Sequence, residues 1–265
     1  MLGTLIKYEF KATWMIMTLI CGVLIGAGVV AGLVGNFLNL NSPTLTDMQE
    51  LLLTFGVIGY AMLVSSLSML SAVFLFVHYY RSLYTPQGYL SFTLPASITE
   101  VVSSRIIVGC IWTLASTLAT FFSVSFTFML SGNFKEIVTF IDEAYATIIE
   151  EVGAASTNLI IFEFILVFIL SSISKMLMYD YSITVGQLWS KHKILGAVIC
   201  YFATQFVMGI ISFTGHFGLM FAAFESSMNF TMRGWITKNL LYSVFLCVAF
   251  YGVAIFVSNK KLNLD

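Results

Sequence analysis

The sequence predicts an all-α membrane protein with six transmembrane helices. Hydrophobic residues make up 59% of the 265 positions and charged residues only 9%, whereas soluble domains carry about 25% charged residues. Six apolar runs are each long enough to cross the hydrocarbon core of a bilayer as a helix, which takes about 20 residues. These two observations exclude a water-soluble globule, a disordered tail and a disulfide-rich secreted module.

The six predicted spans form a single transmembrane domain over residues 1–265. Five of them contain no Asp, Glu, Lys or Arg, and the fourth carries Glu163. The first run is too long for a cleavable signal peptide, and no small-residue cleavage site follows it. The predicted spans are, in chain order, Trp14–Leu38, Leu53–Val77, Ile106–Leu130, Ser156–Met178, Ile194–Phe224 and Asn239–Val257.

The fifth run is longer than a bilayer requires. At 1.5 Å per residue, its roughly 31 residues exceed the thickness of the hydrocarbon core. Gly209, Gly215 and Gly218 lie in its second half. We therefore expect a helix that breaks there and continues as a short re-entrant piece. A single strongly tilted helix is the alternative.

Two amphipathic segments lie outside the predicted spans. Residues 1–13 place Leu2, Leu5, Ile6 and Phe10 on one helical stripe, which predicts an interfacial helix anchored in membrane lipid before the first span. Residues 134–151 combine a helical spacing of apolar residues with five acids and Lys135. This pattern predicts a short amphipathic helix, and a solvated acidic loop is the simpler interpretation of its charges.

The distribution of Lys and Arg predicts the orientation. With six spans both termini lie on the same side of the membrane. That side has nine Lys and Arg residues, and the other side has three. We therefore expect both termini in the cytoplasm and the acidic 134–151 segment outside. The nine positions are Lys7, Lys11, Arg81, Arg105, Lys175, Lys191, Lys193, Lys260 and Lys261, and the other three are Lys135, Arg233 and Lys238.

The predicted cytoplasmic segment between the second and third spans is unusually apolar. Pro86 and Gly88 end the second helix, and Ser97 with Glu100 forms a capping box that opens the third. An exposed apolar segment is costly unless it packs against something. It therefore predicts a docking surface for a soluble partner, with packing on the protein's own helix ends or on lipid headgroups as the alternative.

This segment resembles the cytoplasmic coupling segment of ABC-2 type permeases, the membrane subunits of small bacterial ABC exporters. The matching core is Tyr89-Leu90-Ser91-Phe92-Thr93-Leu94-Pro95. The stretch Thr184–Gly196 resembles the connection between the fourth and fifth spans of the same family. The chain departs from the family at Thr85-Pro86-Gln87, where many relatives have acidic residues.

The resemblance implies the fold and the coupling residues. It implies an ABC-2 type (type V) exporter architecture, with an N-terminal interfacial helix and six spans in a bacterial cell membrane. The coupling loop would contain Arg81, Leu83, Tyr84, Gly88, Tyr89, Leu90, Phe92, Leu94 and Pro95. The second cytoplasmic loop would contribute Gln187, Lys191, His192 and Lys193.

The resemblance also implies the partners and the activity. The sequence has no GxxxxGK[ST] motif and no Gly-Lys pair, so this chain cannot hold ATP phosphates through a P-loop. It is therefore not expected to be an enzyme by itself or to bind a cofactor. Two copies of a cytoplasmic ATP-binding subunit would hold ATP and Mg²⁺. Two permease subunits, with a homodimer favoured, would export a hydrophobic or amphipathic cargo. A peptide or toxin is the first expected cargo, and a drug or lipid is the second.

Few residues inside the predicted spans are candidates for a transport path. Glu163 is either a cavity or gate residue or a carboxyl hydrogen-bonded to a neighbouring helix, and both interpretations stay open. His216 is a second gate candidate, although a lone histidine among aromatic residues is more often structural. The first span also has glycines that would allow another helix to approach closely, either within one subunit or between two. They are Gly22, Gly26, Gly28 and Gly32.

Other classes of protein fit the sequence less well. Twelve basic and thirteen acidic residues create no positive field for nucleic acid, and three scattered histidines predict no metal site. A membrane enzyme would need a nucleophile with a base or a metal cluster, and no such motif is present. A secondary transporter or channel usually places several ionisable groups at the membrane midplane. A non-transporting scaffold or immunity protein is a further alternative.

Overall fold

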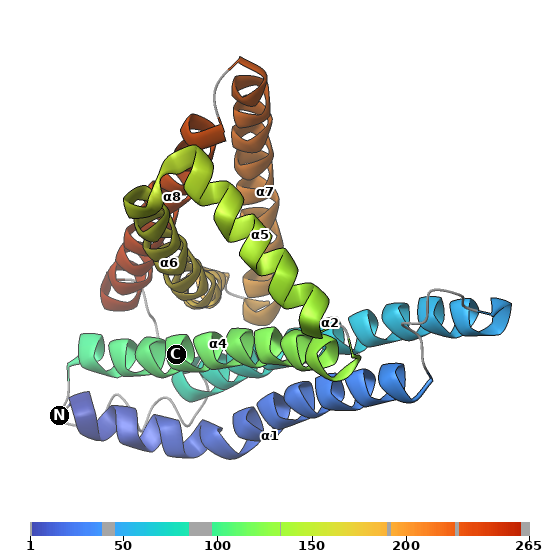
Figure 1. The fold of residues 1–265 in the computed structure, drawn as a ribbon. Coiled ribbons are helices and arrows are strands. Elements are labelled where there is room, and N and C mark those ends of the chain that lie inside the picture. The colour runs from blue at the N-terminus through green and yellow to red at the C-terminus, as the bar shows by residue number, and fades with distance from the viewer. Residues whose placement is uncertain are drawn as a thin grey trace. The chain divides into compact units, whose positions relative to one another are not determined.

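The fold is entirely helical over the part of the chain that is described. The computed structural model describes residues 2–38, 46–84, 97–132, 134–189, 192–225 and 228–260, and at 83–84, 98, 136–137, 151–152, 154–156, 215–225, 228–233 and 259–260 it describes the backbone alone. Within these ranges the helices are α1 (Leu2–Phe37), α2 (Asp47–Tyr84), α4 (Ile98–Leu130), α5 (Phe134–Val152), α6 (Ala154–Gly186), α7 (Lys193–Glu225) and α8 (Met228–Lys260), coloured in chain order in Figure 1.

Six of these helices are long and apolar enough to cross a membrane, which confirms the predicted number of spans. The candidate spans are Leu2–Phe37, Asp47–Ser82, Thr99–Leu130, Thr157–Gly186, Lys193–Thr214 and Gly234–Ser258. The chain is therefore described as a multi-pass membrane protein. The remaining helix, α5, confirms the helix predicted over residues 134–151, and its acids alternate with exposed apolar side chains such as Phe140 and Ile141.

The chain divides into two compact units. Unit 1 comprises residues 1–7, 76–110 and 148–265, and unit 2 comprises residues 8–75 and 111–147. Helices α1, α2, α4 and α5 contribute residues to both units, whereas α6, α7 and α8 belong to unit 1 alone. Each unit has its own packed core and is described separately.

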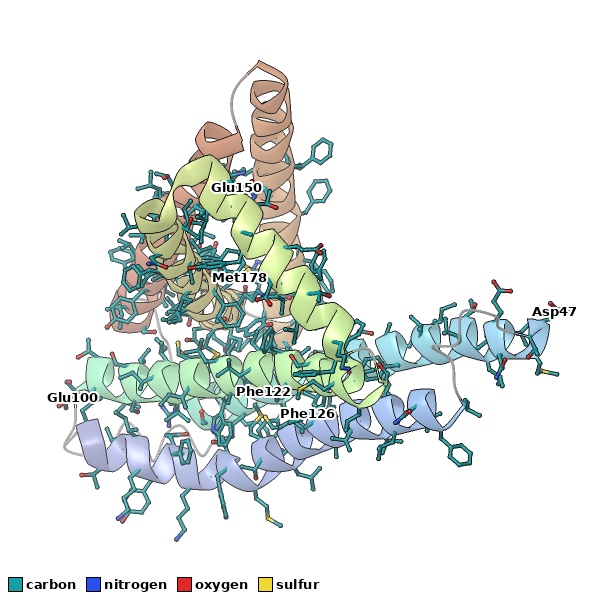
Figure 2. All side chains as sticks on the ribbon, in the orientation of Figure 1. Asp47, Glu100, Phe122, Phe126, Glu150 and Met178 are labelled. Carbon is teal, nitrogen blue, oxygen red and sulfur yellow. The ribbon has the colours of Figure 1, made fainter. Side chains whose placement is uncertain are left out.

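Unit 1 is built around the second half of α6. Tyr179 packs edge-on against Phe76 of α2, with ring centroids 6.4 Å apart, and against Tyr201 of α7 at 5.6 Å. Tyr181 packs against Phe250 of α8 at 5.0 Å. Three helices therefore contact one short stretch of α6, which is the core of this unit. The labelled Met178 lies within this stretch (Figure 2).

Unit 2 is held together by close packing of α1 and α4. A Cβ added at Gly28 would collide with the backbone of Ser123, and one added at Gly32 would lie 2.8 Å from the carbonyl oxygen of Thr127. The Thr127 hydroxyl donates to the Gly28 carbonyl oxygen at 3.1 Å. Figure 2 shows the labelled Phe122 and Phe126 on the stretch of α4 that lies alongside α1. Small residues at these positions allow the two backbones to approach each other.

Helix α1 runs without interruption from Leu2 to Phe37. The predicted interfacial helix over residues 1–13 is therefore not a separate element, because residues 2–13 form the first turns of the span. Phe10 stacks on Trp112 at 4.9 Å between ring centroids, and Trp112 donates from Nε1 to the Thr13 hydroxyl at 2.9 Å. The position of this segment at a membrane surface stays a prediction.

The structure corrects one sequence prediction about the spans and extends another. Helix α7 is continuous from Lys193 to Glu225, so the break expected at Gly209–Gly218 is absent and the single-helix alternative holds. An isolated glycine lowers helix stability by only about 1 kcal/mol, which a continuous apolar helix tolerates. Helix α6 continues to Gly186, eight residues beyond the predicted end at Met178, because no glycine or proline intervenes.

Helix α4 begins as predicted. The backbone N–H of Ser97 donates to the Glu100 carboxylate at 3.1 Å, and the N–H of Glu100 donates to the Ser97 hydroxyl at 3.3 Å. This reciprocal pair is the predicted capping box. It satisfies two backbone donors that the first turn of a helix leaves without a helical partner.

Candidate functional site

The helix ends that flank the two predicted cytoplasmic connections lie at the same end of their bundles. Helices α6 and α8 are parallel, because Ser171 pairs with Ser243 (3.4 Å) and Tyr181 with Phe250 further along both helices. Ser103 near the start of α4 lies 3.1 Å from the Tyr251 hydroxyl near the end of α8. The start of α4 therefore meets the ends of α6 and α8.

Helix α2 ends on the same side as α4 begins. The Tyr60 hydroxyl lies 2.8 Å from the Ser123 hydroxyl, and Ser68, two turns later in α2, lies 3.4 Å from Thr120, earlier in α4. This order of contacts makes α2 and α4 antiparallel. The end of α2 and the start of α4 both belong to unit 1, as do the end of α6 and the start of α7, and residues 85–96 between α2 and α4 lie outside the described residues.

Helix α6 ends in a tight turn at residues 187–189. The backbone N–H groups of Gln187 and Leu188 donate to the carbonyl oxygens of Ile183 (3.2 Å) and Val185 (3.0 Å). A Cβ on Gly186 would collide with the backbone of Ala197, and one on Gly196 would lie 3.1 Å from the Gly186 carbonyl oxygen. The two glycines quoted in the resemblance are therefore the contact at which α7 folds back on α6.

The described residues of the predicted loops occupy different environments. Arg81 and His192 are exposed, whereas Gln187 and Lys193 are partly buried. Leu83 and Tyr84 close helix α2, and only their backbone is described. The remaining predicted loop residues lie outside the described residues: Gly88, Tyr89, Leu90, Phe92, Leu94, Pro95 and Lys191.

The same end of unit 1 contains buried polar side chains that sequence reasoning missed. Asp180 on α6 is completely buried, and Arg105 on α4 is 7% exposed. Both carboxylate oxygens of Asp180, Nε2 of Gln187 and Oγ of Ser258 are buried without a hydrogen-bond partner among the described residues. Because the fourth span was predicted to end at Met178, Asp180 was placed in a loop. The absence of a helix breaker before Gly186 was the signal that α6 continues.

The predicted gate residues lie in α6 and α7. Glu163 is partly buried on α6, one turn from Ile160, which packs with Ile236 of α8 in a small apolar cluster. Phe164 stacks on Trp235 at 6.3 Å between centroids. This register places Glu163 about one turn from Lys238, whose ammonium nitrogen is buried without a hydrogen-bond partner among the described residues. For His216 only the backbone, within α7, is described.

The four glycines proposed for helix packing separate into two pairs. Gly28 and Gly32 face α4 in unit 2, and thus serve packing within one subunit. Gly22 and Gly26 have open space where a Cβ would lie. A role of the second pair in contact with another subunit stays a prediction.

This end of unit 1 combines closely packed helix ends with a few buried polar side chains. No group of three or more His, Cys, Asp or Glu side chains suited to a metal ion occurs among the residues the structure describes. Comparisons with protein-family models, curated proteins and solved structures found no match for the chain. The resemblance to ABC-2 type permeases therefore rests on the residues quoted for it.

Proposed function

We propose that the chain is the transmembrane permease subunit of an ATP-driven ABC exporter. The observation that carries the proposal is the shared location of the two segments quoted in the resemblance. The helix ends that flank both segments belong to unit 1: the end of α2 and the start of α4 for the first segment, and the end of α6 and the start of α7 for the second. A partner that binds one segment is thereby within reach of the other.

The geometry gives such a partner a way to move the transmembrane helices. The coupling segment is followed without a linker by α4, which begins at Ile98 immediately after the capping box. Gly109 of α4 packs directly on the Met176 side chain of α6. A displacement of residues 85–96 would therefore be transmitted through α4 to the core of unit 1, because close-packed helices do not absorb it.

The energy for export would come from a separate ATPase. Two ATP-binding subunits, each holding ATP and Mg²⁺, would close on ATP binding and push on the coupling segments of two permease subunits. The permease pair would then open or collapse a path for a hydrophobic or amphipathic cargo. We propose a peptide as the first candidate for this cargo and a drug or lipid as the second. The protein would lie in a bacterial cell membrane with both termini in the cytoplasm.

The test is co-purification with an ABC-type ATPase encoded beside this gene. We expect the two chains to purify together in detergent and to hydrolyse ATP. Replacing Tyr89, Leu90 and Phe92 with Asp should abolish the association, because charged side chains cannot enter an apolar groove without a large desolvation cost. Membrane insertion should be unchanged, since these residues lie outside the spans.

A matched control keeps this test specific. The triple replacement of Val138, Ile141 and Tyr145 with Asp also adds three charges outside the six candidate spans, in α5. The ATPase should still bind this variant. Retained association by the 89, 90 and 92 variant, or loss in both variants alike, would refute the coupling role of residues 85–96.

A secondary transporter is the second candidate, and one observation favours it. The candidate span Thr157–Gly186 contains a completely buried carboxylate, Asp180, in addition to Glu163. Ionisable residues inside a span are uncommon and often belong to ion or proton pathways. Transport that persists without any ATPase, and that follows an ion gradient, would favour this function over the exporter.

A further inference from the structure

The carboxylate of Asp180 lies in the most enclosed part of unit 1. It sits on α6 six residues before the last helical residue, Gly186, which is roughly 9 Å from the helix end at 1.5 Å per residue. Its solvent exposure is 0%. The two tyrosines on either side of it, Tyr179 and Tyr181, pack on α2, α7 and α8. Water reaches this position only if these helices separate.

No hydrogen bond within the described part of the chain stabilises a negative charge at this position. Neither carboxylate oxygen has a hydrogen-bond partner there. The nearby Cys110 of α4, which lies within electrostatic range, supplies no positive charge. An ionised carboxylate removed from water without a partner is destabilised by several kcal/mol even after the protein relaxes. A buried carboxyl in this setting is stable when it carries a proton.

A metal ion is a poorer fit than a proton. Sodium sites in membrane proteins use carbonyl oxygens freed by unwound helices, whereas α6 is continuous through this region. The neighbouring hydroxyls of Ser182 and Thr184 donate to the carbonyl oxygens of Met178 and Asp180, both at 2.7 Å. The helix therefore presents one carboxyl and no ring of free oxygen ligands.

The same face of α6 leads from Asp180 towards the end of the helix. Thr184 and Gln187 follow at intervals of four and three residues, which places all three on one side of the helix. The Nε2 group of Gln187 is also buried without a hydrogen-bond partner among the described residues. Polar groups in this row give water a route from the end of α6 when the surrounding helices loosen.

We propose that Asp180 is a reversible proton-binding site that links the packing of unit 1 to proton exchange at the Gln187 end of α6. In the packed conformation the carboxyl holds its proton. When water enters along Thr184 and Gln187, the proton transfers to water and the carboxylate becomes hydrated. The reverse step takes a proton from hydronium and allows the core to close. This inference needs only the membrane location of α6 and no ATPase partner.

Other titratable or charged groups lie on α6 and on the helices packed around it in unit 1, beginning with the neighbouring Tyr179 and Tyr181. On α6 itself Lys175 is exposed on a different face of the helix, so it offers no counter-charge to the buried carboxyl. The groups on the helices packed around α6 are Tyr79 on α2, Arg105 and Cys110 on α4, Cys200 and Tyr201 on α7, and Cys247 and Tyr251 on α8. Neither oxygen of the Asp180 carboxyl has a hydrogen-bond partner among the described residues, so none of these groups hydrogen-bonds to it there.

Infrared difference spectroscopy tests the site without a reagent that must reach it. The full chain is purified alone, and spectra of the wild type and of Asp180→Asn are compared while the pH is raised. We expect a protonated carboxylic acid C=O band at neutral pH that shifts in ²H₂O and is lost completely in Asp180→Asn. Raising the pH until water enters should replace this band with carboxylate bands.

Two controls separate this result from its alternatives. Glu163→Gln removes the other carboxyl of α6 and should leave the band in place, because Glu163 lies almost five turns away. If the wild-type spectrum shows only carboxylate bands for Asp180 at neutral pH, the proposal is wrong. Carboxylate bands that shift when Na⁺ replaces a larger cation would identify a metal site instead, which also overturns it. Since no ATPase is present, failure here leaves the exporter proposal unaffected.

Discussion

Unit 1 and unit 2 are both packed from apolar helices, but they bury different polar groups. The buried polar side chains of unit 2 are all hydroxyls: Thr13, Ser71, Ser116 and Ser123. Each of them has a hydrogen bond, such as the 2.8 Å contact of Ser123 with Tyr60. Unit 1 buries Asp180 and Arg105, and the buried side-chain atoms without a hydrogen-bond partner among the described residues all lie in it.

The difference indicates which part of the protein is built to move. In unit 2, hydrogen-bonded hydroxyls and close glycine contacts favour a single arrangement of the helices. Any other arrangement would leave a hydroxyl unpaired or open a cavity between the helices. A buried carboxyl or ammonium group without a hydrogen-bond partner among the described residues, such as Asp180 or Lys238, lowers the stability of the closed arrangement relative to a more hydrated one. We therefore interpret unit 2 as the rigid scaffold and unit 1 as the part that responds to the coupling segment.

The largest expected effect comes from adding a large side chain to the glycine contact between α1 and α4, the seam of Gly28 and Gly32 in unit 2. Gly28→Leu should lower the free energy of unfolding by about 3 kcal/mol, because overpacking against a backbone cannot be relieved by rotating a side chain. Gly26→Leu is the matched control, since its Cβ would meet open space. Thermal unfolding of the two variants in the same detergent measures the difference. Equal stability of both variants would disprove the α1–α4 packing.

Removing one polar group should change the free energy of unfolding by an intermediate amount, in opposite directions in the two units. Tyr60→Phe removes a hydroxyl that is paired with Ser123 and should lower the free energy of unfolding by about 1 kcal/mol. Lys238→Met removes a buried ammonium without a partner but keeps most of the apolar stem, and should raise it by about 1 kcal/mol. Thermal unfolding of both variants decides this. Destabilisation by both would remove the distinction between the units.

The smallest expected effect concerns the candidate gate. Glu163→Gln keeps the shape of the side chain but removes its charge beside the α6–α8 contact. If Glu163 gates transport, the transport-linked ATPase rate of the complex should change about threefold, which is less than 1 kcal/mol in activation free energy. Tyr60→Phe serves as the control in unit 2. An unchanged rate leaves Glu163 with a structural role only.

Sequence reasoning predicted the spans well and the charges inside them poorly. Long apolar runs are an unambiguous signal because a bilayer fixes the length of a helix, and the capping box at Ser97 identified the start of α4. The last turns of α6 were missed because the predicted fourth span ended at Met178, so Asp180 was not among the residues considered. Its burial depends on contacts with α2, α7 and α8 that no local pattern contains.

The glycines show the same limit at a finer scale. Four glycines of the first span have the spacing of helix-packing motifs, and the spacing alone leaves their partners undefined. Contacts with α4 distinguish Gly28 and Gly32 from Gly22 and Gly26. Gly186 and Gly196 lie in the stretch quoted for the resemblance, whereas the reason for glycine there, the close approach of α7 to α6, is visible only in the structure.

Nucleotide-dependent hydrogen exchange on the co-purified permease–ATPase complex tests the central claim most directly. With ATP bound and hydrolysis blocked, backbone exchange should change in unit 1 at residues 98–110 and 184–197. Exchange should stay constant in unit 2 along the seam of Gly28 and Gly32. Changes of equal size in both units, or no change in either, would contradict an account in which an ATPase drives unit 1 against a rigid unit 2.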